Sequence, residues 1–215
     1  MKENRVIAID GPAASGKSSV GKRLAALVNS VFVSSGTMYR AFTWAVIDAG
    51  LSFEDHDGIN ALLGQVELKP ERQGERIRIL VNEVDPGEAL TSPEVNQGVS
   101  RVAKIPEVRE VMLNHQRSLI NASDIVMVGR DICSVVFPDT PYKYYLDASE
   151  EVRAARRRAQ GQDDSIAERD KNDSTRKTSP LVVAEGATVV DTSEMTLDDV
   201  VEWIHQDLIK AGYAV

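Results

Sequence analysis

The sequence has little cysteine, little histidine and no long apolar run, and each shortage excludes a class of protein. Its 215 residues include one cysteine, Cys133, which excludes an internal disulfide framework and a cysteine-rich metal site. The three histidines, His56, His115 and His205, have no metal-ligand spacing, and we expect them on surfaces or helix flanks. No apolar stretch approaches the roughly 18 to 20 residues that a membrane-spanning helix requires.

Positive charge is also in short supply. The 25 Lys and Arg residues are outnumbered by 33 Asp and Glu residues, which leaves a net charge of -8. This balance argues against broad binding to nucleic acid polymers, because that binding depends on basic side chains that displace counterions. The apolar run before Asp10 is too short for a signal peptide. We therefore expect a cytoplasmic monomer that binds neither nucleic acid polymers nor membranes.

Apolar runs alternate with helical patterns along most of the chain. The runs rich in β-branched residues cover 5–9, 31–33, 124–128, 142–146 and 187–190. The helical patterns include 18–28, 92–103, 106–121 and 197–211. This alternation predicts an α/β fold in which helices cover a five-stranded parallel sheet. Thr196, followed by Asp199, predicts a capping box for the last helix.

A stretch between the second and third runs breaks this alternation. Extended segments at 66–68, 76–81 and 83–84 are separated by turn signals at Gln73-Gly74 and Asp85-Pro86-Gly87. They predict a small antiparallel β insert, at about 60–98, within a single domain that spans residues 1–215.

A glycine-rich motif lies between the first run and the first helical pattern. It matches G-x-x-x-x-G-K-[ST] at every specified position, as Gly11-Pro12-Ala13-Ala14-Ser15-Gly16-Lys17-Ser18. Such a loop directs backbone N–H groups at the phosphates of a bound nucleotide such as ATP. We expect Lys17 to bridge the β- and γ-phosphates, Ser18 to bind Mg²⁺, and Ser19 to contact the α-phosphate or share the metal ion. The motif alone does not separate kinases from other ATPases and GTPases.

Two further motifs follow the second and third apolar runs. Ser34 to Arg40 reads S-S-G-T-M-Y-R, and Gly129 to Asp131 reads G-R-D. Because the carboxyl ends of parallel strands meet at one edge of a sheet, we expect both motifs beside the phosphate loop. Arg40 and Arg130 would then face bound phosphates.

The ordered set of motifs resembles the bacterial cytidylate kinase family over nearly the whole chain. After the P-loop, the set comprises S-G-x-x-Y-R at 35–40, V-S-R-V-A at 99–103, P-x-V-R at 106–109, G-R-D at 129–131, V-V-F-P-D at 135–139 and R-D-x-x-D-x-x-R at 169–176. The resemblance implies a three-layer P-loop kinase fold with helices on both faces of the sheet, a small β insert and a helical lid at about 153–179. It implies transfer of the γ-phosphoryl group of ATP to CMP or dCMP, with Mg²⁺ as cofactor.

The resemblance also implies roles for individual residues. Ser35 and Arg40 would hold the acceptor nucleotide, and Arg40 and Arg130 would bind its 5′-phosphate. Ser100, Arg109 and Asp131 would read the cytosine ring, since an aspartate accepts from the 4-amino group but opposes the 4-oxo group of uracil. In the lid, Asp173 would lie near the acceptor ribose, with Arg169 and Arg176 on the phosphates.

Three of these residues have alternative interpretations. Asp131 ends an apolar run, as does a Walker-B carboxylate that binds Mg²⁺. Serine near a helix start and arginine on a solvated helix face are commonplace, so Ser100 and Arg109 have these structural alternatives. The chain also departs from the family pattern in a short 160–164 segment, in Ser34 where aspartate is common, and in Cys133 where glycine is usual. We expect Cys133 to be buried and unreactive.

The phosphate loop is also compatible with two other functions. A kinase of another small acceptor, such as AMP, UMP, shikimate or gluconate, would carry the same loop and neighbouring arginines. A regulatory protein that binds ATP without transferring phosphate would need the loop but no second set of arginines.

Overall fold

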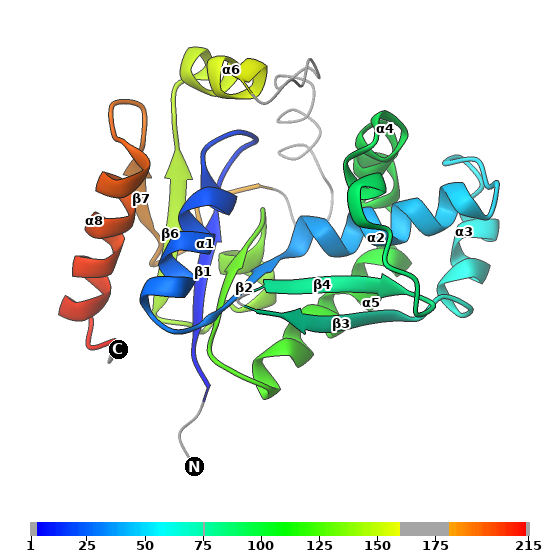
Figure 1. The fold of residues 1–215 in the computed structure, drawn as a ribbon, viewed down its shortest axis with the longest axis horizontal. Helices are drawn as coiled ribbons and strands as arrows, with labels where there is room; N and C mark the ends of the chain where they lie inside the picture. Colours follow the sequence, from blue (N-terminus) through cyan, green and yellow to red (C-terminus); the bar gives the residue numbers. More distant parts are fainter. Residues whose placement is uncertain (1–3, 75, 160–180, 214–215) are drawn as a thin grey trace. The chain divides into compact units, whose positions relative to one another are not determined.

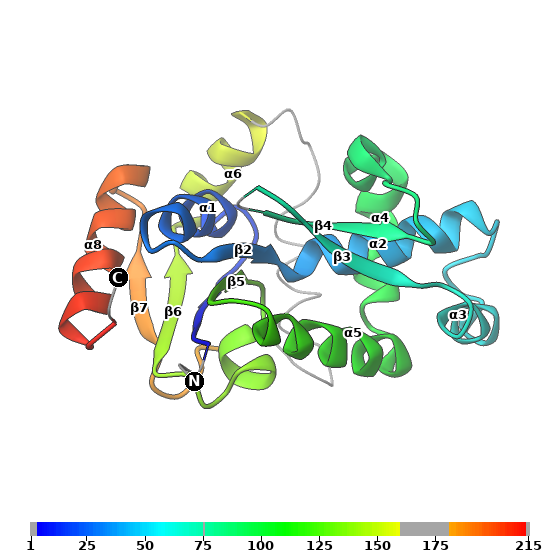
Figure 2. The ribbon, with the colours of Figure 1, turned by 60° about the horizontal axis from the view of Figure 1, so that its bottom comes forward.

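Five parallel strands carry the site, and apart from Ser34, the last residue of the second one, they lie in one of two compact units of the computed structural model (Figures 1 and 2). This first unit comprises Met1–Val33 and Leu119–Val215, and the second comprises Ser34–Ser118. The structure describes residues 4–74, 76–159 and 181–213.

The strands of the first unit are arranged in the order β2-β5-β1-β6-β7. They span Val6–Asp10 (β1), Val31–Ser34 (β2), Ile125–Val128 (β5), Tyr142–Asp147 (β6) and Thr188–Asp191 (β7). β1 pairs in parallel with β5 and β6, and β6 pairs in parallel with β7. Every residue of β1 and β5 is buried, which explains why these strands are continuous apolar runs. The predicted five-stranded parallel sheet is confirmed.

Helices pack on this sheet through one apolar core. These helices are α1 (Lys17–Leu27) and α8 (Leu197–Lys210), whereas α6 (Glu150–Ala159) has no buried residue and is not part of this core. Leu24 of α1 and Ile204 and Leu208 of α8 are fully buried in a cluster with Ile7 and Val126 of the sheet. The predicted capping box begins α8: the Thr196 hydroxyl accepts from the Asp199 N–H, and the Asp199 carboxylate accepts from the Thr196 N–H.

The second unit consists of helices and a β hairpin. Its elements are α2 (Ser35–Asp48), α3 (His56–Leu63), β3 (Leu68–Gln73), β4 (Arg76–Val81), the 3₁₀ helix η1 (Gly87–Thr91), α4 (Pro93–Val102) and α5 (Pro106–Ser118). Ser92 caps α4, because its hydroxyl accepts from the Val95 N–H. The predicted helix at 106–121 is too long: α5 ends at Ser118, and a 3₁₀ turn, η2 (Leu119–Asn121), follows in the first unit.

The predicted insert is an antiparallel hairpin. Its segment at 76–81 is confirmed as β4, whereas the other two extended segments differ from the prediction. β3 begins at Leu68 and not at 66, and it pairs with β4 from Leu68↔Val81 to Gln73↔Arg76. Residues 83–84 are not a strand. Asn82 and Glu83 both have positive φ, as in a type I′ turn, and Val84 returns to bond with Val81.

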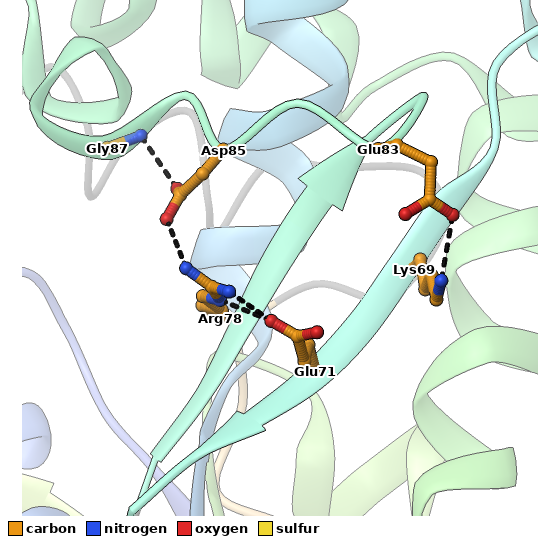
Figure 3. A network of polar contacts seen from close by, with 6 residues as sticks. All are labelled: Lys69, Glu71, Arg78, Glu83, Asp85 and Gly87. Atoms are coloured by element: carbon orange, nitrogen blue, oxygen red, sulfur yellow. Dashed lines mark hydrogen bonds and ion pairs between the residues drawn. The ribbon is translucent and has the colours of Figure 1, made fainter.

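Charged side chains link the hairpin to the turn that leads into η1 (Figure 3). Arg78 of β4 donates to Glu71, its cross-strand partner on β3, and to Asp85, with an Arg78 Nη1 to Asp85 Oδ2 distance of 2.9 Å. Asp85 in turn accepts from the N–H of Gly87 at 2.9 Å. These groups are exposed or half-exposed, so the network orders the turn more than it stabilises the fold.

Candidate active site

The glycine-rich loop connects the end of β1 at Asp10 to the start of α1 at Lys17, as its sequence predicted. Gly11 approaches β6 so closely that a Cβ there would lie 2.1 Å from the carbonyl oxygen of Leu146, and Gly16 has a φ of 95°. Both positions therefore require glycine. No side chain caps α1 at Gly16, so the first turn of the helix is suited to bind an anion.

Lys17 and Ser18 present the polar groups of this loop. The Lys17 side chain is buried and folds back over the loop, where its Nζ lies 2.5 Å from the carbonyl oxygen of Pro12 and 3.3 Å from Ser15 Oγ. Ser18 and Ser19 are exposed in the first turn of α1. A cation and two hydroxyls thus lie at the helix end that favours phosphate.

Asp10, directly before the loop, is a residue that the sequence analysis missed. Its buried carboxylate accepts hydrogen bonds from the backbone N–H groups of Ile132 (2.9 Å) and Cys133 (2.7 Å). These donors begin the single π-helical turn η3 (Ile132–Val136). Burial raises the pKa of Asp10 to about 6, and the nearby Asp131 carboxylate adds to this shift, whereas the two N–H donors oppose it. The available signal was an acidic residue that ends an apolar run.

Arg130 and Asp131 follow β5, next to the end of β1. The Gly129 N–H donates to the Ile9 carbonyl oxygen at 3.0 Å, which places the G-R-D segment at the carboxyl edge of the sheet. The Asp131 side chain is buried. The backbone carbonyl oxygen of Asp131 accepts hydrogen bonds from the N–H groups of Val135 and Val136, which start η3. π-helical turns are frequent at functional sites. The same segment holds Cys133, which is buried as expected, and burial raises the pKa of its thiol, which favours the unreactive protonated form.

Two arginines of α6 contact either the phosphate loop or Thr192, whose hydroxyl lies 3.4 Å from the Ser15 carbonyl oxygen of that loop. The sequence had not distinguished these two arginines from the rest of the basic segment. Arg153 Nη1 lies 3.3 Å from the Ala13 carbonyl oxygen. Arg156 donates to the hydroxyl and the carbonyl oxygen of Thr192 at 3.0 and 2.7 Å. Their spacing of one helical turn was the only signal that they share a face. The lid residues Arg169, Asp173 and Arg176 lie outside the described residues.

The second unit orients Ser35 and Arg40 on α2. Ser35 is buried at the first position of the helix, whereas Arg40 is half-buried. Arg40 Nη1 donates to the carbonyl oxygen of Leu90 (2.9 Å) and to Oδ1 of Asn96 (2.8 Å). Arg40 is therefore directed by η1 and by α4.

Arg109 is buried, with 8% of its surface exposed, so the alternative of a solvated helix face is wrong. Its Nη1 donates to the Ala103 carbonyl oxygen at 3.2 Å, and its guanidinium lies 5.8 Å from the centre of the Tyr39 ring. Ser100 is half-buried near the end of α4 and not at a helix start. Buried arginines are rare without a structural or binding role.

Two side-chain oxygen groups beside the phosphate loop, those of Ser18 and Asp131, are of the kind that binds Mg²⁺. The described part of the chain has no cluster of three or more His, Cys, Asp or Glu residues that could hold a metal by itself. Mg²⁺ takes one or two protein oxygens and completes its shell with water and substrate phosphates. The exposed Ser18 hydroxyl and the Asp131 carboxylate are donors of this kind. Among the residues described, no helix combines the length and apolar character needed to cross a membrane.

Comparisons with known proteins agree with this geometry. The family model described as cytidylate kinase matches residues 7–210. A cytidylate kinase of Caldanaerobacter subterraneus subsp. tengcongensis is 40% identical, covering 95% of this chain and 94% of the relative. That of Exiguobacterium sibiricum is 41% identical, covering 91% and 92%. A solved thymidylate kinase from Candida albicans has a TM-score of 0.50 and 14% identity, covering 98% of this chain and 93% of the other, a likeness of fold.

Proposed function

The chain belongs to the cytidylate kinase family, and on this premise we propose that it transfers the γ-phosphoryl group of ATP to CMP or dCMP, forming CDP or dCDP and ADP. The structural observation that carries the proposal is the position of the Lys17 ammonium group, which lies over the phosphate loop. The strand before this loop, β1, pairs with β5 and contacts the Gly129–Asp131 segment that follows β5. We propose further that the chain is a cytoplasmic monomer, formed as a single P-loop kinase domain with an acceptor-binding insert at about 60–98 and a lid at about 153–179.

On the donor side, residues 11–19 would bind ATP. The backbone of the loop and the first turn of α1 would hold the β-phosphate, and Lys17 would reach the β- and γ-phosphates. Ser18 would bind Mg²⁺, which supplies neutralising charge between these phosphates. Arg153, already 3.3 Å from a loop carbonyl, would add positive potential to the donor site of a protein whose net charge is -8.

On the acceptor side, Ser35, Arg40, Ser100, Arg109, Arg130, Asp131 and Asp173 would bind the monophosphate. Arg40 and Arg130 would hold its phosphate and Asp173 its ribose. Asp131 would accept from the 4-amino group of cytosine, a role supported by its burial, since a buried carboxylate favours a donor over another acceptor.

The reaction then needs positioning and charge stabilisation more than acid–base chemistry. The acceptor phosphate is already an anion and attacks the γ-phosphorus in line, while the bond to the β-phosphate oxygen breaks and ADP leaves. Lys17, Arg130, Arg169 and Arg176 would stabilise the charge on the transferring group. Closure of the lid would exclude water that otherwise accepts the phosphoryl group.

An acceptor panel tests the function directly. ADP release from Mg-ATP is measured with CMP, dCMP, UMP, AMP, shikimate or gluconate supplied separately. We expect rapid, acceptor-dependent release with CMP or dCMP and little with AMP. Highest activity with another acceptor would overturn the acceptor assignment, whereas tight ATP binding without acceptor-dependent ADP would indicate a regulatory protein.

Asp131→Asn separates the two roles considered for this residue. If the carboxylate reads the base, KM for CMP rises by about tenfold or more and the UMP/CMP ratio of kcat/KM increases, because an amide can also donate to a 4-oxo group. The exposed Asp139, changed to asparagine, is the matched control. A fall in kcat with a higher Mg²⁺ requirement and unchanged acceptor preference would instead assign Asp131 to the metal.

A further inference from the structure

Arg40 is held in place by two neutral acceptors. Its Nη1 donates to the Leu90 carbonyl oxygen at the end of η1 and to the Asn96 side chain in the first turns of α4, at 2.9 and 2.8 Å. Arg78 and Arg101, in contrast, each pair with a carboxylate, that of Glu71 and that of Glu54. Both acceptors are uncharged, so these two contacts orient the guanidinium without forming an ion pair.

Asn96 joins Arg40 to the chain segment before α4. While its Oδ1 accepts from Arg40, its Nδ2 donates to the Thr91 carbonyl oxygen at 2.8 Å. The two ends of the amide have opposite polarity, so a flipped side chain would place an NH₂ group against the guanidinium and an oxygen against a carbonyl. Only one orientation satisfies both contacts, and Asn96 therefore locks η1, α4 and Arg40 together.

The β hairpin supports η1, the helix that carries the Leu90 acceptor of Arg40. Arg78 of β4 fixes Asp85, and Asp85 accepts from Gly87, the first residue of η1 (Figure 3). The last turn of η1 carries Leu90 and Thr91, the acceptors for Arg40 and for Asn96. The position of Arg40 thus depends on a short path of hydrogen bonds within one compact unit.

We propose that Asn96 is a positioning residue that orients Arg40 for the phosphate of the acceptor nucleotide and thereby sets acceptor affinity. The inference rests on the proposed function, in which Arg40 binds that phosphate. Asn96 does not itself touch the nucleotide in this scheme. Because Asn96 already restricts the Arg40 side chain before the phosphate binds, less side-chain conformational entropy is lost on binding.

Steady-state kinetics of Asn96→Ala test the proposal. We expect KM for CMP to rise about tenfold, the effect of losing one hydrogen bond to a charged group, with kcat and KM for ATP within about twofold. Gln97→Ala removes an exposed amide from the next position of α4 and is expected to leave all three constants unchanged. Asn96→Asp keeps the size and the acceptor oxygen, but its charge competes with the phosphate, so KM for CMP also rises. This variant carries the test if the alanine variant does not fold.

A double-mutant cycle with Arg40→Ala identifies the route of the effect. If Asn96 acts through Arg40, adding Asn96→Ala to the Arg40→Ala enzyme changes KM for CMP by less than about twofold. An equal rise in both backgrounds, an equal rise in KM for ATP, or no rise at all would overturn the inference while leaving the function intact. An unchanged KM for CMP in Arg40→Ala alone would refute the role of Arg40 and the inference with it, while leaving the function intact. No CMP-dependent ADP from the unchanged chain would refute the proposed function and, with it, the inference.

Discussion

Replacing Lys17 by alanine is expected to lower kcat with CMP at least about a hundredfold, because it removes one preorganised positive group from the transferring phosphoryl. The side chain is buried, and its Nζ lies over the loop between Pro12 and Ser15. The Lys17 side chain therefore needs little rearrangement before it contacts a phosphate. For this reason we expect its removal to raise the free energy of the transition state strongly. Initial rates of ADP release at saturating ATP and CMP measure the loss.

Lys22→Ala is the matched control for this experiment. It removes the same charge from α1, at an exposed position beyond the first turn, and is expected to retain activity within about twofold. Thermal unfolding of both variants verifies that the fold persists. Turnover of Lys17→Ala close to that of the unchanged protein would refute the assignment of the phosphate loop.

Asp10→Asn is expected to remove a pH dependence of stability. The pKa of Asp10 is about 6 in the folded protein against 3.8 for an ordinary aspartate, so the folded state binds more protons than the unfolded state between these values. The stabilisation from this group is therefore fully present below about pH 3.8 and is lost as the pH rises through 6. A shift of about two units corresponds to roughly 3 kcal/mol in the free energy of unfolding.

Urea unfolding of both proteins between pH 4 and 7 measures this effect. Relative to the asparagine variant, the unchanged protein is expected to lose up to about 3 kcal/mol over this range, because the variant cannot titrate at this position. Subtracting the two curves of unfolding free energy against pH removes the contribution of most titrating groups that the proteins share. The nearby Asp131 carboxylate interacts with Asp10 and can therefore still affect the difference. Parallel curves would show that the Asp10 pKa is not raised in the folded protein.

Local patterns predicted the elements that depend on neighbouring residues in the chain. The buried strands β1 and β5 are continuous apolar runs, and the Thr196–Asp199 capping box needs only a spacing of three residues. The hairpin was found from its turn residues and the bounds of β4 were predicted correctly, but those of β3 were not. The start of β3 is set by pairing with β4, and pairing across strands has no signature in one strand alone.

The amino-acid sequence was sufficient to predict the phosphate loop, the parallel sheet and, through its ordered motifs, the family. These features are encoded in contiguous residues whose backbone requirements restrict the amino acids allowed, as at Gly11 and Gly16. The side chains that support the site, in contrast, were identified from the folded chain. Asp10 meets the N–H groups of residues more than a hundred positions away, and Asn96 meets Arg40 across 56 positions. Burial and hydrogen-bond partners depend on such distant segments, so residue type and spacing could not identify them.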